Sequence, residues 1–356
     1  MASIEKRALK DNRFSYRARV QIKGHPVQAA SFEKLNDAKK WASETESLIR
    51  NGKYFKIAEA KKRTLANAIE RYVKEILPKK PRYYKNPLLQ LRWWKQAIGE
   101  HALININPAL IAECRDKLKC TITNRGKARA EATVNRYMAA LSHVFTIAIK
   151  EWGWVETNPL QKVSKMKEPR GRTRFLSEEE REKLLAVCRN CGHPYLYLVV
   201  VLCLSTGARK MEILGLKWKD VDMERKVITL HETKNGERRL LPLAGHALEL
   251  MQEHVKTIDI KGGLVFPAKN KSRPTSIRAA WEKALKNAGV ENFKFHDLRH
   301  SAASYLAMNG ASMAEIAEVL GHKTLNMVKR YAHLSEAHTA KVVESMNRKI
   351  FAGQYS

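Results

Sequence analysis

The chain of 356 residues has few cysteines and no long apolar segment. Five cysteines do not make a disulfide framework at this length, so a reducing, cytoplasmic environment is expected. The longest apolar run, residues 195–204, has ten residues, whereas a membrane-spanning helix needs about 20. The N-terminal sequence MASIEKRALKDNRF lacks the apolar stretch of a signal peptide. These absences exclude secreted, transmembrane and fibrous classes of protein.

Sequence signatures of nucleotide and metal chemistry are missing as well. No GxxxxGK[ST] loop is found, which leaves nucleotide hydrolysis without support, and no cluster of Asp and Glu suggests a two-metal nuclease. Cys188 and Cys191 have CxxC spacing, but no second pair follows at the distance that a zinc finger needs. Two ordinary thiols at a helix end are expected there. We therefore expect no metal and no other cofactor.

Acidic residues are scarce compared with basic ones. The chain has 66 Lys and Arg against 36 Asp and Glu, a formal net charge of +30. The net charge is +9 over residues 1–63, +12 over 64–172 and +9 over 173–356. A basic tail would suggest one disordered arm, whereas this even spread predicts three folded parts that touch one long polyanion. Double-stranded DNA is the first candidate partner, and no membrane is expected.

The residue pattern predicts a mainly α-helical protein with small β-sheets, an α+β class divided into several domains. Within residues 1–60, apolar and polar residues alternate from Phe14 to Ile22, and a turn at 23–26 leads to a second strand expected over 27–32. Helical spacing follows from Asn36, so a small sheet with one helix is expected. Residues 64–160 predict a bundle, because apolar residues recur at helical spacing over 64–77, 88–98, 108–119 and 131–152. A basic linker is expected over 162–174.

Residues 173–356 predict a third, mostly helical domain. It opens with a capping box at Ser177 and continues with an apolar central helix at 195–204. Asn235-Gly236 between two apolar runs predicts a hairpin of strands. After the central helix, strands are expected over 227–230 and 238–243. Helices are expected over 210–216, 244–257, 276–288, 297–308, 312–320 and 324–330.

Six side chains in this domain stand at positions where cationic, imidazole or phenolic groups could do chemistry. His296 and Arg299, at i and i+3, share one face of a helix start, which is itself a good site for an anion. Each residue alone has an ordinary structural explanation, such as a capping histidine or a packing tyrosine. The full set is Arg209, Lys234, His296, Arg299, His322 and Tyr331.

The combination and order of these residues closely resemble the tyrosine recombinase (phage integrase) family. The resemblance rests on STGARKMEILGL over 205–216, TKNG over 233–236, HDLRH over 296–300 and LGHKT over 320–324, followed by Tyr331. It implies a catalytic domain over 173–356, a core-type DNA-binding domain over 64–160 and, less directly, an arm-type DNA-binding module over 1–60. It also implies a recombinase that integrates, excises or inverts a mobile element without metal or ATP.

The resemblance further implies how the six residues act. Tyr331 would be the nucleophile that forms a 3′-phosphotyrosyl bond, while Arg209 and Arg299 clamp the phosphate through bidentate hydrogen bonds. His296 and His322 would position the phosphate, with His296 as the candidate base for the phenol, and Lys234 would protonate the leaving 5′-hydroxyl. Glu212 would orient Arg209 or a neighbouring side chain.

The resemblance also concerns partners and location. A homotetramer on two DNA sites is implied, an accessory DNA-bending or directionality factor is compatible with it, and the protein would be cytoplasmic, nucleoid-associated and encoded by a bacterium or a phage. Basic residues that would contact the DNA backbone, although such runs are often only solvated surface, are Arg17, Arg19, Lys79, Lys80, Arg82, Lys85, Arg125, Lys127 and Arg129.

Two other functions compete with recombination, and a recombinase that serves only as a DNA-binding accessory is a third alternative, which the complete set of six residues disfavours. Residues 312–331 have a fair helix-turn-helix pattern, so a transcription factor in which Tyr331 is only structural is one alternative. A type IB topoisomerase with similar chemistry is the second. The tail after Tyr331 has an apolar face that packs either on its own domain or on a neighbouring protomer.

Overall fold

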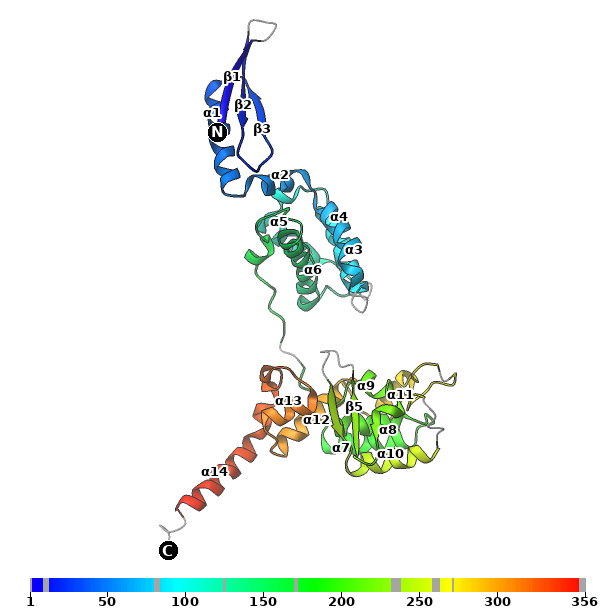
Figure 1. The fold of residues 1–356 in the computed structure, drawn as a ribbon. Helices are drawn as coiled ribbons and strands as arrows, with labels where there is room; N and C mark the ends of the chain where they lie inside the picture. Colours follow the sequence, from blue (N-terminus) through cyan, green and yellow to red (C-terminus); the bar gives the residue numbers. More distant parts are fainter. Residues whose placement is uncertain are drawn as a thin grey trace. The chain divides into compact units, whose positions relative to one another are not determined.

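The computed structural model describes residues 2–8, 13–79, 84–123, 126–169, 172–231, 238–257, 263–270 and 272–351. They form two compact units, Met1–Arg170 and Gly171–Ser356 (Figure 1). Helices predominate in both, and each unit holds one small three-stranded sheet, which confirms the predicted fold class. None of the described helices is both long and apolar enough to cross a membrane.

The chain begins with an antiparallel sheet that carries one helix on one face. The strands are β1 (Ala2–Ala8), β2 (Phe14–Val20) and β3 (Gln28–Phe32), followed by the helix α1 (Leu35–Arg50) (Figure 1). Ala18 and Val20 are fully buried together with Ala38, Ala42 and Ile49 of the helix. The two strands predicted over 14–22 and 27–32 are therefore confirmed as β2 and β3. The helix starts after Lys34 and not at Asn36.

The rest of the first unit is helical. Its helices are α2 (Tyr54–Lys62), α3 (Leu65–Glu75), α4 (Lys85–Ile98), α5 (Pro108–Cys120) and α6 (Glu131–Lys150). Thr64 caps α3 by accepting a hydrogen bond from the Asn67 backbone, and Trp94 is fully buried, donating from its indole to the Tyr137 carbonyl at 2.9 Å. The four predicted helices of this region are confirmed, and α2 is an additional one.

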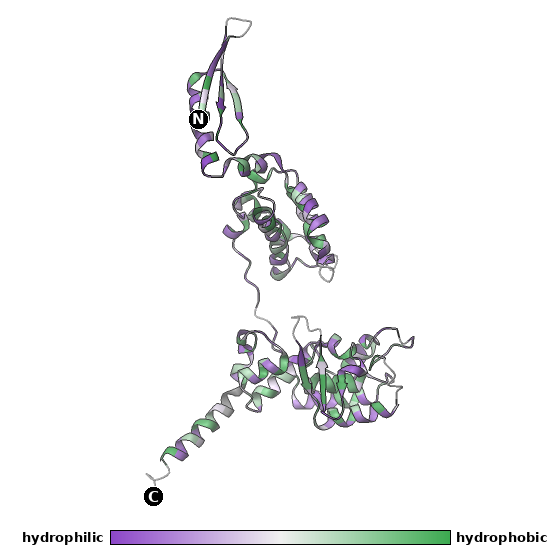
Figure 2. Ribbon diagram, in the orientation of Figure 1, coloured by the Kyte–Doolittle hydropathy of each residue, from purple (hydrophilic) through white to green (hydrophobic). Residues whose placement is uncertain are grey.

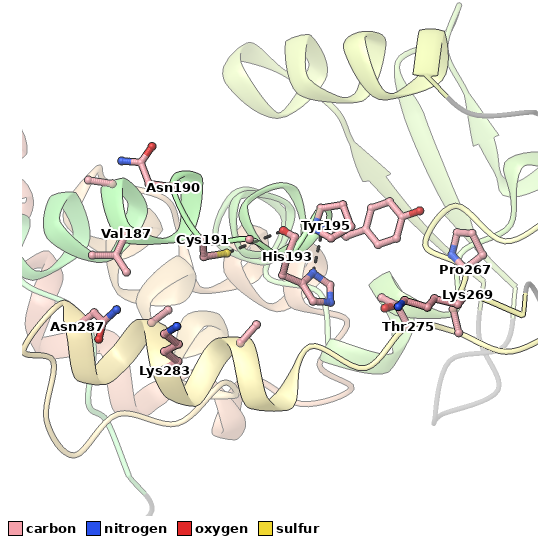
Figure 3. Close-up of a pocket in the computed structure, with 16 residues that line it drawn as sticks. Val187, Asn190, Cys191, His193, Tyr195, Pro267, Lys269, Thr275, Lys283 and Asn287 are labelled. Carbon is pink, nitrogen blue, oxygen red and sulfur yellow. Dashed lines mark hydrogen bonds between the residues drawn. The ribbon is translucent and has the colours of Figure 1, made fainter.

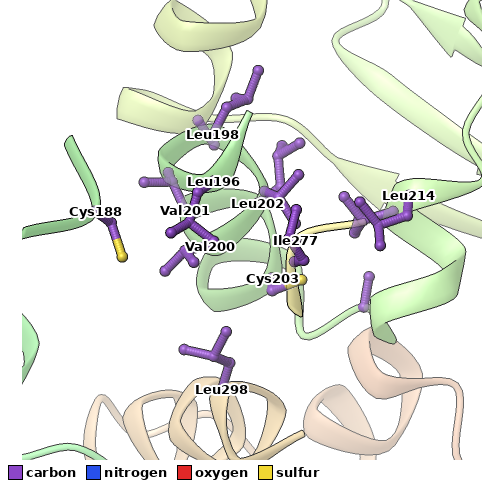
Figure 4. Close-up of a cluster of buried hydrophobic side chains, with 14 of the residues drawn as sticks. Cys188, Leu196, Leu198, Val200, Val201, Leu202, Cys203, Leu214, Ile277 and Leu298 are labelled. Atoms are coloured by element: carbon purple, nitrogen blue, oxygen red, sulfur yellow. The ribbon is translucent and has the colours of Figure 1, made fainter. Parts of the chain in front are cut away.

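The second unit is built around one buried helix. The helices are α7 (Glu178–Arg189), α8 (Leu196–Thr206), α9 (Lys210–Leu214), α10 (Gly245–Thr257), α11 (Arg278–Asn287), α12 (Asp297–Met308), α13 (Met313–Leu320) and α14 (Glu336–Phe351). Helix α8 is apolar on all sides, and other elements of the unit surround it. Residues such as Leu196, Val200 and Leu202 are therefore inaccessible to solvent (Figure 4).

A second antiparallel sheet lies in the same unit. It consists of β4 (Val221–Asp222), β5 (Val227–Leu230) and β6 (Arg239–Pro242), in the order β4-β5-β6. Leu230 pairs with Arg239 at the end of the β5–β6 ladder, as the predicted hairpin requires. The predicted turn at Asn235-Gly236, with Lys234, lies outside the described residues.

The helix predicted over 324–330 is wrong. This fully described stretch forms two short 3-10 segments, η6 (Leu325–Met327) and η7 (Lys329–Ser335), after α13 has ended at Gly321 with a left-handed backbone (φ 64°). A helix-turn-helix motif needs a second α-helix to enter the major groove. The helix-turn-helix interpretation of residues 312–331 therefore loses its recognition element.

Candidate active site

Arg209 stands where the central helix ends and the chain turns back. Gly207 adopts a left-handed conformation (φ 62°) that ends α8, and a Cβ there would lie 2.5 Å from Leu320 Cδ2, so a larger residue would strain the backbone and displace Leu320. Arg209 then precedes α9 and donates to Glu212 twice, from its backbone N to Oε2 at 2.8 Å and from Nη1 to Oε1 at 2.5 Å. The predicted role of Glu212 as a partner of Arg209 thus has a defined geometry.

Glu212 stays ionised although it is largely buried. Burial alone would raise the pKa of its carboxyl, but the hydrogen bonds from Arg209 and the positive charge of Arg239 outweigh burial and hold this pKa below its ordinary value. A carboxylate fixed in this way restricts the orientation of the Arg209 guanidinium, whose side chain is 24% exposed.

Arg299 reaches the same turn from α12. It is 4% exposed, and its guanidinium donates from Nη1 to the Gly207 carbonyl at 2.7 Å and from Nη2 to the Leu320 carbonyl at 2.5 Å. Burial, followed by repulsion from Arg209 and Arg239, lowers its pKa to about 10, so it keeps its charge at neutral pH. The two predicted arginines, far apart in sequence, are therefore held at the turn that ends α8.

His322 follows the left-handed Gly321 and lies in the electrostatic field of these arginines. Its Nδ1 atom is buried without a hydrogen-bond partner. Burial, and then the charges of Arg299 and Arg209, lower its pKa to about 4. A neutral imidazole with an unsatisfied buried nitrogen is an incomplete polar group, which a bound polar ligand would complete.

Tyr331 lies in η7 and packs against α12 and α13. It is 2% exposed, and its hydroxyl hydrogen-bonds to His300 Nδ1 at 2.5 Å. His296, the predicted base, lies one helical turn before His300, with its ring centroid 5.5 Å from that of His300. The structure thus brings His300, and not His296, to the phenol in this conformation. Burial raises the pKa of Tyr331, and the charges of Arg330 and Arg299 offset this only in part.

The sequence of this chain is similar to those of known proteins. Residues 174–338 match the model of the phage integrase family. The shufflon-specific DNA recombinase of Escherichia coli is 32% identical over 295 residues, which cover 81% of this chain and 74% of that protein. The chain belongs to the phage integrase family. It is a tyrosine-type site-specific recombinase.

Other similarities agree with this assignment. The integrase of Salmonella phage P22 is 32% identical over 238 residues, 63% of this chain and 60% of the phage protein. Among solved structures, the Tn1549 transposon integrase bound to transposon right end DNA matches with a TM-score of 0.63, 18% identity and coverage of 79% and 99% of the two chains. A lambda integrase dimer bound to a COC' core site matches with a TM-score of 0.62, 19% identity and coverage of 93% and 95%. The last two show the same fold.

Two residues of this recombinase, the half-buried His300 and the buried Arg239, were missed by sequence reasoning. His300 was part of the HDLRH motif, but its i+4 spacing from His296 puts both on one helix face, so the pattern does not choose between them. Arg239 looked like one more basic residue beside a hairpin, yet it is 8% exposed and contacts Glu212. The signal that could have found Arg239 is its place in a predicted strand, where it lies on the buried face and the next residue, Leu240, lies on the exposed face.

The basic residues predicted to contact DNA lie in the first unit of the recombinase. Arg17 and Arg19 are exposed on the sheet face opposite α1, because their neighbours Ala18 and Val20 point to that helix. Lys79, Lys85 and Lys127 are exposed as well, whereas Arg129 is half-buried with its guanidinium 5.5 Å from the ring centre of Tyr137. Lys80, Arg82 and Arg125 lie outside the described residues.

A pocket of about 920 Å³ lies apart from these catalytic candidates, between the end of α7 and α11 (Figure 3). Val187, Cys191, Tyr195 and Lys283 are among the residues that line it, and no residue of the arginine–histidine–tyrosine set does.

Cys191 shares this region with the buried Cys188, whose pKa is raised to about 12 by burial and then by Cys191. Both are free thiols. Among the described residues, no three His, Cys, Asp or Glu side chains gather to hold a metal.

The half-buried His300 predicts a pH-dependent stability. Burial, and then the neighbouring His296, lower the pKa of His300 from 6.5 to about 4. Between these values the unfolded chain binds more protons at His300 than the folded chain does, so the free energy of unfolding falls as the pH decreases from about 6.5 to 4. Replacing His300 by Gln keeps a polar side chain without titration and is expected to flatten this decline in urea titrations at a series of pH values. The exposed His333→Gln variant serves as the control and should keep the wild-type slope; an equal flattening there would contradict the assignment.

Proposed function

We propose that this recombinase rearranges a mobile DNA element by transesterification with Tyr331 as the nucleophile. The Tyr331 oxygen bonds to the scissile phosphorus while the bond from phosphorus to the 5′ oxygen breaks, which leaves a 3′-phosphotyrosyl bond and a free 5′-hydroxyl. Attack by that hydroxyl reverses the step on a new partner strand. The bond energy is kept in the covalent intermediate, so rejoining needs no ATP. The observation that carries the proposal is the convergence of Arg209 and Arg299 on the turn at Gly207, with Tyr331 packed against the helix of Arg299.

The other residues have separate tasks in this proposal. Arg209 and Arg299 neutralise charge that develops on the non-bridging oxygens, and His322 with its free Nδ1 adds a contact to the phosphate. Lys234 donates the proton that the leaving 5′ oxygen needs. Because Tyr331 is only 2% exposed, its hydroxyl must leave His300 before it can reach a phosphate. Once the hydroxyl has moved, His296, three residues before Arg299 in the sequence, is the proposed proton acceptor.

We also propose that the recombinase acts as a homotetramer on two DNA sites in the bacterial nucleoid. A lambda integrase tetramer bound to a Holliday junction is among the structural neighbours, with a TM-score of 0.59 and 21% identity. Helix α14 supports assembly, since Figure 2 shows it alternating between hydrophobic and hydrophilic residues along its length. Its exposed apolar side chains are Val342, Val343, Met346, Ile350 and Phe351, each at least 44% exposed. A face of this kind suits a neighbouring protomer better than its own domain.

Recombination between two cognate sites, followed on a plasmid, tests the proposal as a whole. We expect deletion of residues 338–356 to abolish recombination and synapsis of two sites, while the affinity for a single site falls less than about threefold, because no described residue of the deleted segment belongs to a core cluster. Gel shifts with one site and sedimentation with two sites separate these effects. Unchanged synapsis after the deletion would refute the role of α14 in assembly.

A further inference from the structure

Arg239 is a buried cation to which no role in the reaction has been given so far. It is the first residue of β6 and stands five positions after Lys234 in the sequence. Its side chain is 8% exposed, and burial lowers the pKa of its guanidinium, while the charge of Glu212 opposes this effect. Removing a guanidinium from water is costly unless several partners compensate it, so its contacts indicate what it is for.

The first partner of Arg239 is the carboxylate that orients Arg209. Arg239 Nη2 donates to Glu212 Oε2 at 3.1 Å, and the same oxygen accepts the Arg209 backbone N at 2.8 Å. Glu212 Oε1 accepts Arg209 Nη1 at 2.5 Å. Glu212 therefore joins two guanidinium groups, and Arg239 restricts the rotation of the carboxylate that holds Arg209.

The second partner is the carbonyl that also binds Arg299. Arg239 Nη1 donates to the carbonyl of Leu320, which accepts Arg299 Nη2 at 2.5 Å as well. The next residue is Gly321, where a Cβ would lie 2.9 Å from both Cδ and Nη1 of Arg239, so the guanidinium packs directly on this backbone. His322 follows. Arg239 thus fixes the end of α13, on which the position of His322 depends.

These contacts join Arg239 to both arginines of the predicted phosphate site. Arg209 and Arg239 bind the one carboxylate, Glu212, and Arg299 shares the Leu320 carbonyl with Arg239. Three guanidinium groups with one carboxylate leave two positive charges without an acidic partner in the contacts of this cluster. Such an excess of buried positive charge favours an anion in its vicinity. Arg239 holds both predicted phosphate-binding arginines through shared acceptors.

We infer that Arg239 is a positioning residue for transesterification: through Glu212 and the Leu320 carbonyl it holds Arg209, Arg299 and His322 in the arrangement that stabilises the negatively charged transition state. The inference rests on the roles proposed above for Arg209, Arg299 and Tyr331. It assigns Arg239 to the charge-stabilising part of the site and not to the protonation of the leaving group by Lys234.

The test compares Arg239→Met with wild type on three nicked suicide duplexes that differ only at the scissile phosphate. One has the ordinary phosphate. The second has a methylphosphonate, which carries no negative charge and needs less stabilisation by arginine. The third has sulfur in place of the 5′ bridging oxygen, and this leaving group needs no general acid, because a thiol ionises far more readily than an alcohol. The measurement is the rate at which the covalent protein–DNA adduct forms.

We expect Arg239→Met to slow adduct formation about a hundredfold on phosphate, as for the loss of one stabilising donor, and just as much on the bridging-sulfur substrate. On methylphosphonate the deficit should shrink below about tenfold. Arg239→Lys, which keeps the charge but loses the planar fork, should be intermediate on phosphate. Arg225→Met, at an exposed arginine of the same unit, is the matched control and should equal wild type on all three.

Each other outcome would overturn the inference. Recovery on bridging sulfur would mean that Arg239 acts through Lys234, an equal deficit on all three substrates would mean that it only supports the fold, and no deficit would mean that it has no role. One protein preparation is used for all substrates, so partial unfolding lowers the three rates alike and does not imitate the expected pattern. A wild-type protein that forms no adduct on any substrate would instead contradict the proposed function.

Discussion

Replacing Tyr331 by Phe is expected to abolish the covalent protein–DNA adduct while leaving the affinity for a single recombination site within about twofold. The substitution removes only the hydroxyl oxygen that would bond to phosphorus. The lost hydrogen bond to His300 costs about 1 kcal/mol of folding free energy, which does not unfold a unit with cores of this size. Incubation with nicked suicide duplexes, followed by denaturing electrophoresis and mass spectrometry of the linked peptide, measures the adduct.

Tyr305→Phe provides the matched control for this experiment. Tyr305 lies on α12, is half-buried, and donates from its hydroxyl to the Leu176 carbonyl at 3.0 Å. This variant loses a comparable hydrogen bond in the same unit but none of the proposed chemistry, so it should form adduct at nearly the wild-type rate. An adduct that persists in Tyr331→Phe would show that another residue is the nucleophile.

The secondary structure of this protein could be predicted from the sequence wherever apolar and polar residues recur with the period of a helix or a strand. Ser177 and Glu180 form the predicted capping box of α7, and the strand 227–230 has the predicted bounds. Strand β1 was missed because its sequence, ASIEKRA, is exposed on both faces except at Ile4, which leaves no alternation of apolar residues. The stretch 324–330 was taken for a helix because Met327 and Val328 are apolar at its centre, but only Val328 is buried.

Only those residues of the candidate site that stand in short sequence motifs could be predicted. Arg209, Arg299 and His322 stand in short sequence patterns, and the structure brings them to the turn after α8 and the end of α13. The contacts between Arg239 and Glu212 and between His300 and Tyr331 join residues 27 and 31 positions apart. Such contacts depend on how helices and strands pack, so neither spacing nor composition predicts them.

Replacing Arg209 by Ala is expected to slow cleavage by about a thousandfold or more, while single-site affinity falls less than about tenfold. A thousandfold change corresponds to about 4 kcal/mol of transition-state stabilisation, the amount that a preorganised donor to a developing anion supplies. Many other cations remain to bind the DNA backbone, so one arginine contributes little to affinity. In this variant Arg239 and the backbone N–H of residue 209 still bind Glu212, so the carboxylate keeps partners and the fold should be retained.

The measurement pairs single-turnover cleavage with gel-shift affinity at fixed salt. Arg278→Ala is the control, because Arg278 is an exposed arginine of the same unit, paired with Glu282 across one helical turn. It should change neither quantity by more than about twofold. Arg209→Lys keeps the charge but not the two-pronged geometry, so its cleavage rate should fall between wild type and Arg209→Ala. If affinity and cleavage fell by the same factor in Arg209→Ala, Arg209 would be one more backbone anchor, since an interaction made equally in the bound ground state and the transition state does not accelerate the chemical step.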